Sequence, residues 1–219
     1  MDRIYFGALT LCAMFGFIYG LVKFFREPSA LYSRIIVFGI GCTMLGRLFA
    51  TLQLYTTGEI QHGFHVGVLG IVGSFLFFLS ANYGQMDSLA DDGSARIRKY
   101  RWIAVIAPAV VVAMYLVTIR LNGWGERAVV DGIITLVISQ ASYFHLKHLI
   151  VPDVEGAVIH SIRGYNRMAL IYAGLCMAEM IVNCIPNAGI WKHLLYVALC
   201  INLVLFIPVL EGGVKKWRI

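Results

Sequence analysis

Two ionisable residues lie in the middle of long apolar stretches of this sequence. They are Arg47 and Glu179, which lie thirteen residues after Arg34 and twelve residues after Arg167, respectively. A charge at the centre of a membrane helix costs about 2.5–3.5 kcal/mol on insertion scales, so it needs a partner or a water-filled cavity. At about 1.5 Å per residue, both side chains reach a similar depth. We predict that they pair across a common interior, either in a ligand site or only to fix helix packing; alternatively, Arg47 extends alone toward the lipid headgroups.

Further polar side chains lie near the predicted depth of this pair or at the ends of neighbouring apolar stretches. A few polar groups among apolar and aromatic walls suit a small solute. We therefore predict an outward-opening polar vestibule. For Ser74 and Asn202, hydrogen bonding between helices is an equally good interpretation. The predicted ligand-binding residues are Arg47, Glu179, Asn183, Asn202, Ser74 and Asp131.

Three histidines at the predicted outer ends of these stretches could hold a metal. His62 and His65 are three residues apart and could share a helix face, so with His193 they could form a three-nitrogen zinc site with an open position. A haem held by His65 and His193 is a second possibility, and contact with lipid headgroups needs no metal at all. The sequence contains neither HExxH nor GxSxG, and the main interpretation requires no cofactor.

Two groups near the other ends of the apolar stretches are interpreted as exposed. His145 and His148 flank Lys147, which we interpret as a basic helix end that faces lipid phosphates. Asp91 begins an acidic turn that lacks the spacing of a calcium loop, so we expect a solvated turn. The five cysteines lie within apolar stretches without CxxC spacing and are expected to be packing residues.

Seven stretches are long enough to position these residues as membrane helices. The chain of 219 residues is 59% hydrophobic and only 14% charged, with a mean hydropathy of +0.77, which is far from the average of soluble domains. A crossing needs about 20 mostly apolar residues. We predict an all-α integral membrane protein with one transmembrane domain over residues 1–219. The predicted crossings are 4–22, 35–55, 64–82, 102–119, 129–144, 168–185 and 193–210.

Basic residues predict the orientation of this domain, because cytoplasmic loops retain Lys and Arg. With the N-terminus outside and the C-terminus cytoplasmic, thirteen of the eighteen basic residues fall on the inner side and four on the outer side. All four Trp then lie at membrane interfaces, where amphipathic indoles are favoured. The net charge of +6 is explained by these loops, so we exclude a nucleic-acid partner. We expect a multi-pass protein of the plasma (inner) membrane, with the lipid bilayer as its first partner.

Two segments of the chain match at a constant shift of 133 residues. The match predicts parallel half-repeats, 1–90 and 128–219, joined by a linker helix 102–119; chance similarity between Leu-rich helices is the alternative. This 3+1+3 arrangement resembles, in topology and length only, the small sugar carriers of the SWEET type. The chain has no Pro-Gln pair or other signature of that family, so no residue role follows from the resemblance. The matched pairs are Tyr32 and Tyr165, Arg34 and Arg167, Gly41 and Gly174, and Met44 and Met177.

The sequence leaves three functions open. The first is a small-solute transporter or carrier with its vestibule between the two halves. The second is a sensory or regulatory subunit that binds a small ligand and signals through its inner loops to a separate protein partner. The third is a membrane-embedded enzyme that depends on a metal or haem held by the outer histidines and on Glu179.

Overall fold

The computed structural model describes residues 2–26, 29–59, 63–87, 91, 93–152, 158–186 and 188–215. Within these ranges, all regular secondary structure is helical. The helices are α1 (Asp2–Phe25), α2 (Leu31–Thr56), α3 (Val66–Ser80), the π-helix η1 (Ala81–Met86), α5 (Ala95–Ala104), α6 (Ile106–Asn122), α7 (Glu126–Ile150), α8 (Val158–Val182) and α9 (Gly189–Lys215).

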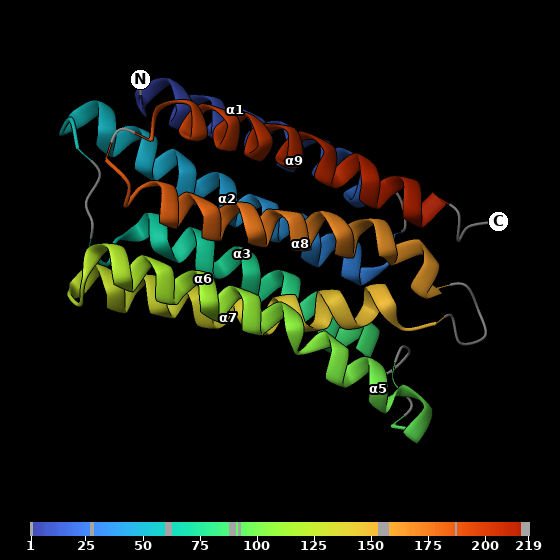
Figure 1. The fold of residues 1–219 in the computed structure, drawn as a ribbon. Helices are drawn as coiled ribbons and strands as arrows, with labels where there is room; N and C mark the ends of the chain where they lie inside the picture. The colour runs from blue at the N-terminus through green and yellow to red at the C-terminus, as the bar shows by residue number, and fades with distance from the viewer. Residues whose placement is uncertain are drawn as a thin grey trace.

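Six long helices form a closed ring around the buried interior. Going round the ring, α1 packs against α2, α2 against α3, α3 against α7, α7 against α8, α8 against α9, and α9 against α1 again. Helix α6 lies outside this ring against α7 and α8, and many of its apolar side chains are exposed. The long helices run side by side, and the start of α1 and the end of α9 lie at opposite ends of the bundle (Figure 1).

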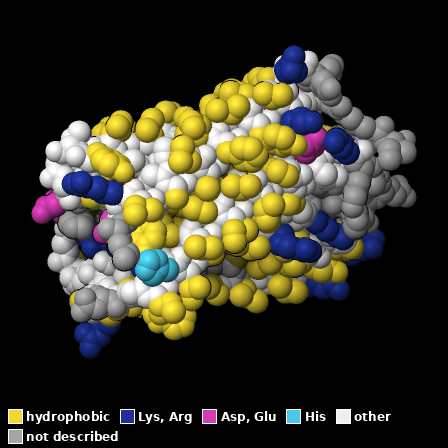
Figure 2. All heavy atoms as spheres, turned by 90° about the horizontal axis from the view of Figure 1, so that it is seen from above, with side chains coloured by type: hydrophobic (Ala, Val, Ile, Leu, Met, Phe, Trp, Pro, Cys, Tyr) yellow, Lys and Arg dark blue, Asp and Glu magenta, His cyan; other side chains and the backbone are white. Residues whose placement is uncertain are grey.

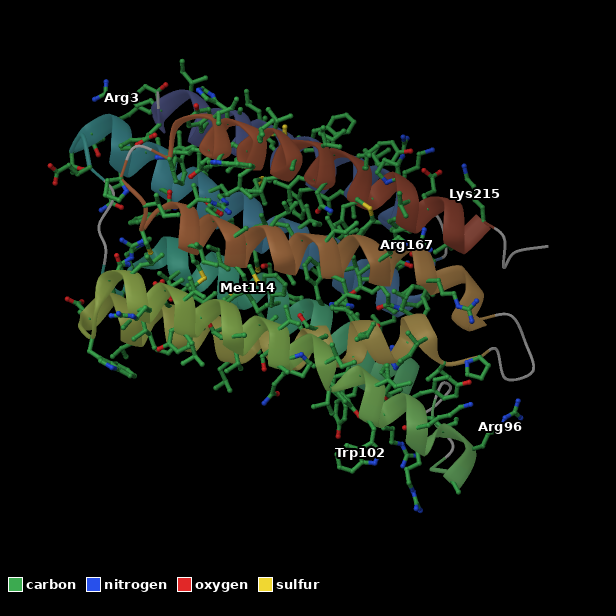
Figure 3. The ribbon with its side chains drawn as sticks, in the orientation of Figure 1. Arg3, Arg96, Trp102, Met114, Arg167 and Lys215 are labelled. Atoms are coloured by element: carbon green, nitrogen blue, oxygen red, sulfur yellow. The ribbon has the colours of Figure 1, made fainter. Side chains whose placement is uncertain are left out.

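We name the two ends of the bundle after the chain terminus that each one holds. Arg3 lies at the N-terminal end, whereas Arg96 and Lys215 lie at the C-terminal end (Figure 3). Between the two ends, the face shown in Figure 2 is covered mainly by hydrophobic side chains, and Lys and Arg gather toward its ends. An apolar belt between charged ends is the surface that a lipid bilayer requires.

Among the residues that the structure describes, six segments are long and apolar enough to cross a membrane. They measure 19 to 28 residues, and at about 1.5 Å per residue each can span a hydrocarbon layer about 30 Å thick. The protein is therefore a multi-pass helical membrane protein. The seventh predicted crossing, 168–185, overlaps α8 and extends three residues beyond its end. It is not among these six, since α8 also carries Asn166, Arg167 and Glu179. The six segments are Asp2–Phe25, Leu31–Thr56, Val66–Gly84, Ala95–Asn122, Glu126–Ile150 and Gly189–Lys215.

Small residues allow α2 and α3 to approach closely. A Cβ atom added at Gly70 would lie 2.4 Å from the Cα atom of Gly46 and 2.7 Å from the carbonyl oxygen of Cys42. Neither backbone group can move aside as a side chain could. Close contact of this kind is common between membrane helices, where small residues increase the packing area.

Helix α3 ends in an irregular turn. Residues Ala81–Met86 form the π-helix η1, which continues directly from α3. π-helices are rare and occur mostly as single turns within α-helices, frequently at functional sites. Here the turn contains Asn82, whose side chain is fully buried.

Candidate functional site

Arg47 of α2 and Glu179 of α8 form a bidentate ion pair across the interior of the ring. Nη1 of Arg47 donates to Oε1 of Glu179 at 2.6 Å, and Nη2 donates to Oε2 at 2.5 Å. The two residues are only 4% and 7% exposed. Two parallel N–H···O bonds fix both the distance and the plane of the two groups. The predicted pairing is confirmed, and the alternative of an isolated Arg47 at the headgroups is wrong.

Neighbouring aromatic residues complete the surroundings of this pair. The hydroxyl of Tyr196 donates to Oε1 of Glu179 at 3.3 Å, and the Arg47 guanidinium lies 5.9 Å from the centre of the Phe6 ring. Nε of Arg47 is buried and has no acceptor among the residues that the structure describes. The ion pair therefore includes one buried donor that lacks an acceptor, and burying an unsatisfied polar group costs free energy.

A cavity of about 150 Å³ lies beside the ion pair. Its wall brings together four of the predicted ligand-binding residues, Arg47, Glu179, Asn183 and Asp131. Arg127 also lines the cavity and was not among the residues predicted from the sequence. Residues from α1, α2, α3, α7 and α8, most of them apolar, and His65 provide the rest of the surface. The lining residues are Phe6, Gly46, Arg47, Ala50, His65, Gly67, Val68, Ile71, Arg127, Val130, Asp131, Ile134, Cys176, Glu179, Met180 and Asn183.

A second hollow adjoins this cavity at the N-terminal end of the bundle. It measures about 500 Å³ and shares Phe6, Arg127 and Asn183 with the first. Its remaining walls include charged residues near the start of α1, the end of α2 and the start of α9. The two spaces are therefore neighbours, with the wider one toward the chain terminus and the narrower one at the ion pair. The other residues that line the second hollow are Asp2, Leu54, Gly58, Glu59 and Lys192.

Two predicted ligand-binding residues, Ser74 and Asn202, line neither the cavity nor the second hollow. The hydroxyl of Ser74 donates to the carbonyl of Ile71 at 2.7 Å within α3. Nδ2 of Asn202 donates to the carbonyl of Met168 at 3.2 Å, which joins α9 to α8. For Asn202 this contact is the helix-to-helix hydrogen bond that the sequence offered as the alternative to ligand binding.

The predicted outer histidines have separate partners. His65 caps the first turn of α3, where Nδ1 accepts from the amide of Gly67 at 3.0 Å. His193 is hydrogen bonded to the hydroxyl of Tyr5 on α1. His62 lies outside the described residues. Across the described residues, no group of three or more His, Cys, Asp or Glu side chains is arranged to hold a metal. The zinc and haem sites therefore stay predictions.

Aromatic side chains fill the interior on the C-terminal side of the ion pair. Phe75 stacks on Tyr172 with ring centres 5.4 Å apart, and Phe78 stacks on Phe206 at 5.2 Å. The Tyr165 ring meets both Phe78 and Phe206 edge to face. All five side chains are fully buried. This aromatic layer is a packed core rather than an open path.

A network of buried polar residues lies beyond the aromatic layer. Nδ2 of Asn82 is 2.6 Å from Nδ1 of His145 and donates to Oδ1 of Asn166 at 3.0 Å. Oδ1 of Asn82 is 3.2 Å from Nδ1 of His148. Asn82, on the π-helix, thus connects α7 to α8. The four side chains are completely buried.

This polar network continues into charged residues at the C-terminal end. Nζ of Lys147 lies 2.5 Å from Oδ1 of Asp87 and 2.8 Å from Oδ2 of Asp91. Nε2 of His148 is 3.1 Å from the same oxygen of Asp87. Asp91 also accepts two hydrogen bonds from Arg101, at 2.5 and 2.7 Å. The interpretation of His145, His148 and Lys147 as lipid-facing is therefore wrong, because their side chains turn inward to these partners.

The two carboxylates of this network are held in their ionised form. Hydrogen bonds from Arg101, opposed by burial and supported by Lys147 and the Gly93 amide, hold the pKa of Asp91 far below its usual range. Burial alone would raise the pKa of Asp87, but hydrogen bonds from His148 and Lys147 lower it overall. The turn at Asp91 was expected to be solvated, but Arg101 and Lys147 hold its side chain in place. A sequence signal was available, since Asn82, His145 and Asn166 are polar residues at the same ends of neighbouring crossings.

The comparisons with known proteins add no further assignment. No protein-family model matches the chain. Neither a curated protein nor a solved structure is significantly similar to it. The class of the protein, a multi-pass helical membrane protein with a buried ion pair beside a cavity, follows from the sequence and the structure together.

Proposed function

We propose that this protein is a small-solute carrier whose substrate site is the cavity beside Arg47 and Glu179. The observation that carries the proposal is the placement of this ion pair. It borders a cavity that adjoins a wider hollow at one end of the bundle, whereas an aromatic layer fills the interior on its other side. A carrier needs such a site, reached from one side of the membrane and closed from the other.

The order of helices in the ring supports a carrier built from two halves. If α1, α2 and α3 are exchanged with α7, α8 and α9, every contact of the ring falls on another contact of the ring. For example, the α3 and α7 contact falls on the α9 and α1 contact. This is the pattern expected of parallel repeats, related by an axis along the membrane normal, with α6 as the linker. Arg47 and Glu179 then come from corresponding helices, α2 and α8.

A rocking motion of two rigid halves against each other would act directly on the ion pair. Arg47 belongs to one proposed half and Glu179 to the other, so rocking of the halves changes the distance between them. In the low dielectric of the interior, separated charges are costly unless a ligand or water replaces the lost partner. A solute that engages both groups would lower that cost. We infer that the N-terminal end faces outward, in agreement with the distribution of basic residues.

Uptake into proteoliposomes tests the carrier directly. We expect the purified protein to take up at least one solute from panels of amino acids, sugars and cofactors, above the level of protein-free vesicles. Glu179→Gln should lower that uptake at least tenfold, because it removes the charge that pairs with Arg47. The double exchange Arg47→Glu with Glu179→Arg should restore part of it.

The result that would overturn the proposal is also specific. A protein that is folded, as judged by a cooperative thermal transition, and that moves no solute in any panel is not a carrier of this kind. Uptake that is equal in Glu179→Gln and the unmodified protein would remove the ion pair from the mechanism.

A further inference from the structure

The ionised groups that line the cavity balance one another. With His65 counted as neutral, the wall holds two positive side chains, Arg47 and Arg127, and two negative ones, Asp131 and Glu179. A ligand with a net charge would add an uncompensated charge to a poorly solvated site, which is costly. The wall therefore favours a ligand whose own charges sum to zero.

The positive side of the wall has hydrogen-bonding capacity left. Nε of Arg127 is 3.8 Å from Oδ2 of Asp131, and its Nη2 is 3.7 Å from Sγ of Cys184. The first distance exceeds the 2.7–3.2 Å typical of N–H···O hydrogen bonds. The Arg127 side chain is 28% exposed, so a ligand can reach it. Its planar guanidinium matches a carboxylate with two parallel hydrogen bonds.

The negative side has room for a donor from the ligand. Oε1 of Glu179 accepts from Arg47 and Tyr196, and Oε2 accepts from Arg47. A carboxylate offers about four lone-pair positions, so one position on Oε2 is left for an ammonium group. The cavity thus presents donors for an anion and an acceptor for a cation within one small space.

The size and the apolar walls limit the rest of the ligand. An apolar cavity of about 150 Å³ holds one benzene molecule, so a ligand of roughly six to nine non-hydrogen atoms fits here. Part of that volume is bordered by branched and thioether side chains, which favour an aliphatic group. These apolar lining residues are Val68, Ile71, Val130, Ile134 and Met180.

We propose that the cavity binds a small zwitterion of the α-amino-acid type with a short aliphatic side chain. Its carboxylate binds Arg127, its ammonium binds Glu179, and its side chain contacts the apolar wall. This inference names the substrate class of the proposed carrier and in that sense rests on the proposed function. Binding is measured at equilibrium, however, and does not depend on transport.

Binding of valine to the full chain, purified in a detergent free of zwitterionic lipid, tests the proposal. Isovalerate and isobutylamine are matched probes, because each keeps the carbon skeleton of valine next to the one charged group that it retains. We expect isothermal titration to give at least tenfold tighter binding for valine than for either probe. Glutamate and lysine, which carry a net charge, should bind at least tenfold more weakly than valine.

A pair of arginine variants locates the site. Arg127→Gln should weaken valine binding at least tenfold, because it removes the group that binds the carboxylate of valine. Arg127 is partly exposed and is not part of the buried ion pair between Arg47 and Glu179. Arg120→Gln is the matched control, because Arg120 is exposed near the end of α6 and does not line the cavity. It should bind valine like the unmodified protein. Circular dichroism on both variants confirms that the helices are retained.

Each contrary outcome has a separate meaning. Equal binding of valine and either singly charged probe would overturn the zwitterion site, as would binding of phosphatidylethanolamine with no binding of valine. Valine binding without valine uptake would leave the site standing and count against the carrier. Uptake of another solute class by a protein that does not bind valine would retain the carrier and reject this substrate class.

Discussion

At the scale of single residues, the sequence predicted the buried ion pair between Arg47 and Glu179. Arg47 and Glu179 could be matched because each was the isolated charge in its crossing and their depths agreed. Arg127 and the Asn82 network could not be identified in the same way. Arg127 lies near a helix start, where an exposed Arg is ordinary, and its place in the cavity wall depends on the rotation of α7. Likewise, the inward turn of His145 depends on the partners supplied by η1 and α8.

The Asp91 contacts predict a pH-dependent stability at the C-terminal end. The folded-state pKa of Asp91 lies below its unfolded value of about 3.9, so its contribution is present above that pH and is lost as the pH falls through lower values. We expect the difference in melting temperature between the unmodified protein and Asp91→Asn to be largest near pH 6 and to shrink toward pH 3. Differential scanning calorimetry in detergent measures it.

Arg101→Gln provides an independent check of the same contacts. It removes the donor with the largest effect on Asp91, so it should lower the melting temperature near pH 6 and have a smaller effect near pH 3. If both variants lower the melting temperature equally at every pH, the ionised state of Asp91 is not what stabilises this end of the bundle.

At the scale of elements, helix existence was easier to predict than helix ends and exact roles. Six of the seven apolar stretches correspond to segments that meet the length and composition of a crossing. The expected ends were several residues short, because polar residues continue the helices beyond the apolar part, as in α7 (Glu126–Ile150). The π-turn after α3 has no clear pattern in hydropathy, so it could not have been predicted.

The close contact between α2 and α3 predicts a large effect of one added methyl group. Gly70→Ala would place its Cβ against the backbone of α2 and must push the two helices apart. Small-to-large changes in packed interiors cost about 1–3 kcal/mol, so we expect a melting temperature lower by several degrees and weaker ligand binding, since Gly46 and Gly67 line the cavity. Thermal unfolding and the valine titration measure the two effects.

Gly174→Ala is the matched control for this change. A Cβ at Gly174 in α8 meets no atom within 4 Å, and alanine favours a helix more than glycine does. Its melting temperature should therefore be equal to or higher than that of the unmodified protein. Equal destabilisation by the two variants would show that helix contact at Gly70 is not the cause.

At the scale of the whole molecule, the distribution of basic residues predicts which end faces the cytoplasm. The start of α1 and the end of α9 lie at opposite ends of the bundle, which agrees with an odd number of crossings (Figure 1). In the sequence, the proposed repeat rests only on scattered identities, since packing in lipid constrains residue size more than residue type. The ring order of the helices is the stronger argument for it, and that order required the structure.

Reporter fusions test the predicted orientation. Green fluorescent protein fused after Lys215 should be fluorescent, and alkaline phosphatase at the same place should be inactive, because the C-terminal end is expected to be cytoplasmic. Alkaline phosphatase inserted at Gly123, which follows α6 at the N-terminal end, should be active. The reverse pattern at both positions would turn the whole molecule over and place the cavity on the cytoplasmic side.

The contact between α1 and α9 has a consequence for how the bundle could move. Near one end, Asp2 forms an ion pair with Lys192 and Tyr5 is hydrogen bonded to His193. Near the other end, Glu211 accepts a hydrogen bond from Tyr19 and forms an ion pair with Lys23. Separating these helices would break polar contacts at both membrane surfaces. This contact is therefore suited to be a fixed pivot in the proposed carrier. The opposite contact, where α3 and η1 meet α7, is also held near the C-terminal end, by Asn82 with His145 and by Asp87 with Lys147 and His148. The two proposed halves would therefore part at the N-terminal end, beside the cavity.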